Sequence, residues 1–136
     1  MDYLKISKEV IGPLYESYAS LRKSSLNQGI LALVELRVSQ MNGCAYCCGL
    51  HSDEARKHGL EQKKLDVLPA WRTAKTSFTD EEHLALVWAE ALTKNESSLE
   101  LREQVARVYP EKELVDLTAA VSLMNGLNRI AMSLRE

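Results

Sequence analysis

The 136-residue sequence has few of the features that mark disulfide-rich, membrane or nucleic-acid-binding proteins. Its three cysteines all lie at positions 44–48, so they cannot join distant segments. The formal net charge is only -2, and acidic and basic residues are mixed along the chain without a basic stripe that would favour nucleic acid. No stretch approaches the roughly 20 apolar residues of a membrane span. We therefore expect neither a nucleic-acid partner nor a membrane partner.

Residues 1–5 lack the long apolar run and the small-residue cleavage site of a secretory signal, so we expect a cytoplasmic protein. Cytoplasmic thiols are kept reduced, and a close cysteine pair there is more often catalytic or metal-binding than structural. Hydrophobic residues make up 46% of the chain and charged residues 26%, which is ordinary for a globular protein. This composition and length predict a single domain over residues 1–136.

Apolar residues recur at helical spacing along nearly the whole chain, and no segment of convincing length alternates with the period of a strand. The expected helices cover residues 14–23 after Gly12-Pro13, 26–41, 44–58, 61–68, a segment that begins at the capping box 79–82, 99–108, and 111 to about 132. Asn42-Gly43 should end the most apolar of these, and Gly59 should cap the next. The predicted fold class is all-α, a bundle of about six to eight helices.

The segment Cys44-Ala45-Tyr46-Cys47 opens the helix expected over residues 44–58. Cysteines three apart lie on one helix face, within reach of a disulfide. A helix N-terminus stabilises thiolates and can lower a cysteine pKa from about 8.5 to ~3.5–7.5, which favours Cys44 as the more acidic thiol. His51 lies four residues after Cys47, so its imidazole can take that thiol's proton or stabilise the thiolate. The pattern predicts a dithiol redox site with its own base.

Zinc and a purely structural cysteine pair are the alternatives to a redox site. A structural zinc site needs four ligands, typically in two separated pairs, but this sequence has no second pair, and His58 and His83 stand alone. We therefore expect no metal. Cys48 is expected to be a small buried hydrophobic residue, and the two other histidines are expected at the surface.

At these residues the sequence resembles the AhpD-like alkylhydroperoxidase group within the carboxymuconolactone decarboxylase family. Residues 33–47 and His51 carry the resemblance, and residues 55–59, 68–72, 85–92 and 125–129 continue it, so it spans about residues 26–129. It implies an AhpD-like helical bundle that forms homo-oligomers, often trimers or hexamers, and needs no bound cofactor. It also implies that Cys47 is the peroxidatic thiol, Cys44 the resolving thiol and His51 part of a proton relay.

The sequence departs from this family at one relay position. The family's relay usually includes a glutamate twelve residues before the first cysteine, where this chain has Ala32. Glu35, one helical turn later, is the nearest substitute and completes the candidate catalytic set with the two cysteines and His51. It lies in an apolar run, so its carboxylate needs a partner. His51, Arg37 and solvent are the alternatives, and a role at an interface, or a side chain that extends along apolar surface to reach solvent, is a further one.

The resemblance implies thiol-dependent reduction of a hydroperoxide, with regeneration by an external dithiol or a thioredoxin-like reductant. The absence of an acid at position 32 leaves open a dithiol–disulfide oxidoreductase or redox sensor with little peroxidase activity. Lactone-acid decarboxylation, which gave the family its name, does not need a CxxC pair, and a non-enzymatic oligomeric scaffold is the last alternative. The late polar group Asn125, Asn128 and Arg129 is expected to bond at a helix terminus or to face solvent, or else to line the site or an interface.

Overall fold

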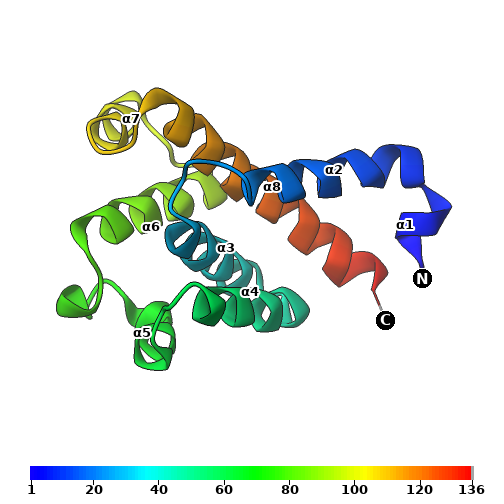
Figure 1. The fold of residues 1–136 in the computed structure, drawn as a ribbon, viewed down its shortest axis with the longest axis horizontal. Helices are drawn as coiled ribbons and strands as arrows, with labels where there is room; N and C mark the ends of the chain where they lie inside the picture. Colours follow the sequence, from blue (N-terminus) through cyan, green and yellow to red (C-terminus); the bar gives the residue numbers. More distant parts are fainter. Residues whose placement is uncertain (136) are drawn as a thin grey trace.

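The computed structural model describes residues 1–135, and over this range the chain forms helices and no strand (Figure 1). The α-helices are α1 (Tyr3–Ile6), α2 (Lys8–Leu21), α3 (Gln28–Asn42), α4 (Ala45–Lys57), α5 (Gln62–Val67), α6 (Asp80–Thr93), α7 (Leu99–Ala106) and α8 (Glu111–Leu134). Two short 3-10 turns, η1 (Leu68–Ala70) and η2 (Lys75–Ser77), connect α5 to α6. The all-α prediction is confirmed. None of the helices in the described range is long and apolar enough to cross a membrane.

Helix α3 lies at the centre of the bundle and packs against α4, α6 and α8 (Figure 1). Its apolar residues cover more than one face, so nearly the whole helix is buried. One apolar cluster joins α3 to α6, α7 and α8, and a second joins it to α4, α5, η1 and α6. Helices α1 and α2 extend along the edge of the bundle, and the start of α1 and the end of α8 lie on the same side (Figure 1). The central helix α3 therefore packs directly against α4 and supports it.

The expected start of α2 was wrong. The helix begins at Lys8 and passes through Gly12-Pro13 instead of starting after them. Proline inside a helix removes one backbone hydrogen bond, here the one to the carbonyl of Glu9. Glu9 and Pro13 are both exposed, so water can replace that bond, and the helix continues through the proline.

The other predicted boundaries are close to the observed ones because local chemistry sets them. Gly43 ends α3 in the left-handed region (φ 73°), and Gly59 takes the same conformation after α4 (φ 85°). The Thr79 side chain accepts from the Glu82 amide at 3.1 Å, while the Glu82 carboxylate accepts from the Thr79 amide at 2.9 Å. This is the capping box expected at the start of α6.

Candidate functional site

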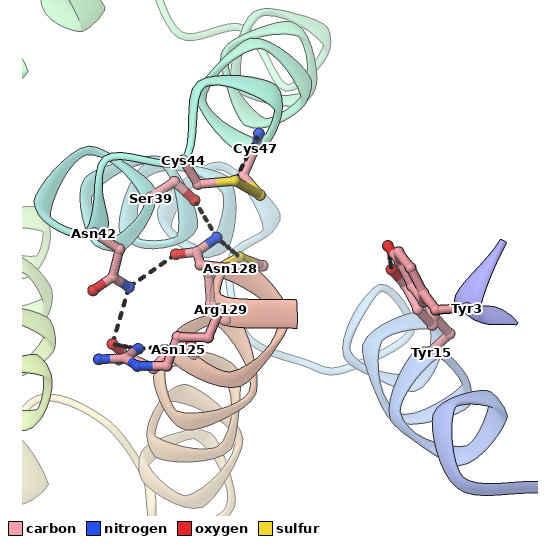
Figure 2. The surroundings of a disulfide bond; sticks show 10 residues. Tyr3, Tyr15, Ser39, Asn42, Cys44, Cys47, Asn125, Asn128 and Arg129 are labelled. Atoms are coloured by element: carbon pink, nitrogen blue, oxygen red, sulfur yellow. Dashed lines mark hydrogen bonds between the residues drawn. A yellow bond between two sulfur atoms is a disulfide. The ribbon is translucent and has the colours of Figure 1, made fainter. Parts of the chain in front are cut away.

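The Cys44–Cys47 pair lies where α3 turns into α4. Gly43 reverses the chain, and Cys44 then becomes the N-cap residue of α4, with its Sγ accepting from the Cys47 amide at 3.4 Å. The two sulfurs form a disulfide, with a Cα–Cα distance of 5.3 Å (Figure 2). Only 2% of Cys44 and 5% of Cys47 is exposed, and Ala131 of α8 packs against them. The structure thus brings the predicted dithiol pair together at a helix start.

A polar network behind the disulfide joins α8 to the end of α3. Asn128 is completely buried, and its amide donates to the Ser39 hydroxyl at 3.1 Å, while the Ser39 carbonyl accepts from the Cys44 amide at 3.0 Å. Asn42 donates to the side-chain oxygens of Asn128 (2.9 Å) and Asn125 (3.0 Å), as Figure 2 shows. Asn128 is therefore neither solvated nor a helix-terminus residue, and it holds the turn that carries Cys44.

His51 lies one turn after Cys47 on α4 and is only 2% exposed. Its Nδ1 atom is 2.9 Å from Oε2 of Glu54 and 3.4 Å from Oε2 of Glu35. A ring nitrogen that faces carboxylates carries the proton, which leaves the lone pair of the neutral ring on Nε2. In that tautomer, Nε2 is the acceptor atom of His51, and it lies on the side of the ring away from the two carboxylates.

The carboxylate of Glu35 is fully buried on α3. Its partners are His51 and Arg22, whose Nη1 donates to Oε1 at 3.0 Å and whose Nη2 binds Oε2. Arg37, considered above as a partner, instead binds Glu90, and Glu35 has no solvent-exposed surface. Burial raises the pKa of Glu35, and the hydrogen bonds from Arg22 oppose this rise.

Three residues that the sequence analysis missed complete the cluster: Arg22, Glu54 and Tyr18. Arg22 also reaches Glu54 Oε2 at 3.3 Å, and its guanidinium lies 3.6 Å from the centre of the Tyr18 ring. The Tyr18 hydroxyl donates to Glu54 Oε1 at 2.7 Å. Burial acts to raise the pKa of Glu54, but the hydrogen bonds from His51 and Tyr18 lower it to about 2. The spacing of Glu54 three residues after His51 could have indicated their contact. Nothing in the local sequence indicates Tyr18 on α2 or Arg22, the residue that follows α2.

The carboxylates and the imidazole could in principle ligate a metal. One ligand atom each from Glu35, His51 and Glu54 lies within 4.8 Å of the others. Arg22, however, already brings a cation to both carboxylates. Within the described part of the chain, one of the two negative charges in this cluster is therefore offset by a guanidinium.

The remaining candidate residues lie apart from this cluster or at its edge. Cys48 is a free, half-buried thiol that packs against the second apolar cluster, and burial raises its pKa. His58 is exposed, as expected. His83 lies at the surface but is half-buried, with ring centres 5.3 Å from Trp71 and 6.0 Å from Phe78, so it is less solvated than expected.

Comparison with known proteins identifies the class of protein that this fold and site define. The profile of the Carboxymuconolactone decarboxylase family matches residues 14–91, more than half of the chain, so the protein belongs to this family. The uncharacterized protein YdfG of Bacillus subtilis (strain 168) is 32% identical over 137 residues, covering 98% of this chain and 92% of that protein. The uncharacterized protein YnjA of Escherichia coli (strain K12) is 29% identical over 114 residues, and the match covers 82% of this chain and 62% of that longer protein.

Solved structures confirm the AhpD-like fold. A crystal structure of a protein of unknown function from Agrobacterium tumefaciens, named as a candidate antioxidant defence protein AhpD, superposes with a TM-score of 0.91. It is 29% identical, and the match covers 100% of this chain and 94% of that one. An uncharacterized peroxidase-related protein from Silicibacter sp. TM1040 has a TM-score of 0.81 at 21% identity, covering 92% of this chain and 68% of that one. This second likeness concerns the fold alone.

Proposed function

We propose that this protein is a thiol-dependent peroxidase in which Cys47 attacks a hydroperoxide and Cys44 resolves the product. One observation carries the proposal: the Cys44–Cys47 pair lies at the start of a helix, one turn before a buried histidine that two carboxylates orient. Family membership and the name of the Agrobacterium relative support it.

The proposed reaction has two chemical steps before reduction. The Cys47 thiolate attacks the outer oxygen of the hydroperoxide, the O–O bond breaks, and the leaving alkoxide takes a proton to become an alcohol. Cys47 is then a sulfenic acid. The Cys44 thiolate attacks its sulfur, the disulfide forms, and the hydroxide that leaves becomes water. An external dithiol or a thioredoxin-like protein restores both thiols by two exchange steps.

His51 and Glu35 have supporting roles in this proposal. His51 takes the Cys47 proton and returns it to the alkoxide, and the carboxylates on its Nδ1 side stabilise the imidazolium that forms. Glu35 would replace the acid that relatives of the AhpD group carry at the position of Ala32. Its burial and its 3.4 Å distance from His51 support that role.

We further propose that the protein works in the cytoplasm as a homo-oligomer, a trimer or a hexamer. Apolar side chains on the peripheral helices α1 and α2 support the assembly, because Ile6 is 69% exposed and Val10 is 61% exposed. The partners in the reaction are a hydroperoxide and a dithiol reductant, and no cofactor is required.

One observation favours a second candidate function, a dithiol–disulfide oxidoreductase. The Cys44 sulfur, not that of Cys47, accepts the N-cap hydrogen bond of α4, which favours Cys44 as the stabilised thiolate. With Ala32 at the relay position, such a site would exchange disulfides quickly and reduce peroxide slowly.

Hydroperoxide consumption with dihydrolipoamide or thioredoxin as reductant tests the proposal. We expect the wild type and Cys48→Ser to turn over at similar rates, while Cys47→Ser and Cys44→Ser lose turnover. Equally slow consumption by the wild type and Cys47→Ser would overturn the peroxidase assignment. Rapid reduction of a disulfide substrate by the same wild-type protein would then favour the second function.

A further inference from the structure

Arg22 forms the link between helix α2 and the two acids beside His51. Its Nη1 and Nη2 bind the two oxygens of Glu35, and Nη2 also lies 3.3 Å from Oε2 of Glu54. A planar guanidinium is suited to such a bridge, because its donors lie in one rigid fork. Tyr18 fixes the guanidinium from one face, at 3.6 Å from the ring centre. The same cation therefore touches both carboxylates that face Nδ1 of His51.

The bridge changes the net charge of the groups around His51. With a neutral imidazole, two carboxylates and one guanidinium sum to -1, and protonation of His51 brings the cluster to zero. Without Arg22 the sums would be -2 and -1, and both carboxylates would hold the ring as imidazolium. The nearby Lys57 and His58 line a cavity of about 190 Å³ with Arg22, Glu35 and Glu54, and both are exposed. Solvent screens exposed groups, so these two side chains offset the charge of Glu35 and Glu54 less than Arg22 does.

We propose that Arg22 is a positioning residue for His51: by bridging Glu35 and Glu54, it offsets the negative charge that would otherwise favour the protonated imidazole. A general base must be able to release the proton that it takes up, and two uncompensated carboxylates beside the ring would favour its protonated form. The hydrogen bonds from Arg22 also favour the ionised form of the fully buried Glu35, against the effect of burial, which raises its pKa. The inference rests on the proposed function, in which His51 is the base of the thiol reaction.

Titration of the imidazole resonances by NMR tests this role directly. The chain has three histidines, and His83, which packs between two aromatic rings away from Arg22, serves as the internal reference. The oxidised protein is used, with the Cys44–Cys47 disulfide intact, so the result does not depend on peroxide reduction. A lack of peroxide turnover would contradict the proposed function alone, and an unchanged titration would contradict the role of Arg22 alone.

Arg22→Gln should raise the midpoint of the His51 titration by about 1 pH unit or more, because two carboxylates lose their cation. Glu35→Gln should lower it, and the double variant Arg22→Gln/Glu35→Gln should return to within about 0.5 pH unit of the wild type. Arg37→Gln is the matched control, because it breaks another buried arginine–glutamate pair, with Glu90, away from His51.

The double variant also covers the case in which Arg22→Gln alone fails to fold. In the double variant position 35 is neutral, so no buried charge is left unpaired there and the protein should fold. Comparing the double variant with Glu35→Gln then measures the effect of removing Arg22 in a background without the Glu35 charge. We expect that comparison to show an upward shift of about 1 pH unit. A midpoint that is the same with and without Arg22, in either background, would overturn the proposal. So would an equal shift in Arg37→Gln.

Discussion

Oε2 of Glu35 lies 3.4 Å from Nδ1 of His51, and both side chains are almost completely buried. The contact joins the central helix α3 to the helix that carries the dithiol. It gives the histidine a carboxylate partner although position 32, one turn earlier on α3, is alanine. Under the proposed function, Glu35 would serve as the relay acid from a position one helical turn later, with Arg22 bound to both of its oxygens.

Replacing Glu35 with glutamine should slow the peroxidase reaction. The amide keeps the shape of the side chain but cannot stabilise the imidazolium that forms when His51 takes a proton, so kcat/KM should fall by about 10-fold or more. Glu90→Gln is the matched control, since Glu90 is equally buried but binds Arg37, Trp71 and Arg72. Steady-state kinetics with a hydroperoxide would measure both, and equal losses in the two variants would contradict a specific role for Glu35.

Glu54 should stabilise the folded protein in a pH-dependent way. Its pKa is lowered to about 2 in the folded state, below the value of 4.5 for a free side chain. A lowered pKa means that the stabilisation is fully present above about pH 4.5 and is lost as the pH falls towards 2. Glu54→Gln should therefore cost about 1–3 kcal/mol of unfolding free energy at pH 7. Urea unfolding should show the gap closing at acidic pH, and a gap independent of pH would contradict this account.

Much of the fold could be predicted because its boundaries depend on neighbouring residues. The glycine at position 43 and the capping box at Thr79 act within one turn, and the structure confirms both. The start of α2 could not be predicted in this way. Whether Pro13 ends a helix depends on whether solvent can replace one backbone hydrogen bond, which is a property of the folded surface.

The candidate site, like the fold, could be predicted only where its residues lie close together in the sequence. The two cysteines, His51 and Glu54 lie on one short stretch of chain, and their helical spacing brings them together. Arg22 joins them only because α2 packs where it does, and nothing in its neighbourhood in the sequence indicates a buried ion pair. The partner of Glu35 was accordingly only half predicted: His51 was among the alternatives considered and Arg22 was not.

Asn128 should stabilise the fold around the disulfide, although it lies far from the two cysteines in the sequence. Truncation to alanine removes the bonds to Ser39 and Asn42 and leaves buried polar groups without partners, so we expect a loss of about 1–3 kcal/mol. Ser122→Ala, on an exposed turn of the same helix, should change little. Denaturant unfolding of the oxidised proteins would measure the difference, and similar stabilities for the two variants would refute the structural role of Asn128.

The reduced protein should have a reactive thiol below the pH at which ordinary cysteines react. The start of α4 holds both sulfurs of the pair and favours a thiolate there, so alkylation by iodoacetamide should have its midpoint below about pH 8.5. Burial raises the pKa of Cys48, so a Cys48→Ser variant should give the same curve. A midpoint at or above about pH 8.5 would mean that the helix start stabilises no thiolate.

Trapping the sulfenic acid tests the central claim most directly. In a Cys44→Ser variant, Cys47 cannot be resolved, so one equivalent of hydroperoxide followed by dimedone should label Cys47, as peptide mass spectrometry would show. The account predicts this adduct, and its absence from a Cys44→Ser/Cys47→Ser double variant that keeps Cys48. No adduct at Cys47, or an adduct that forms instead at Cys44 in a Cys47→Ser variant, would contradict it.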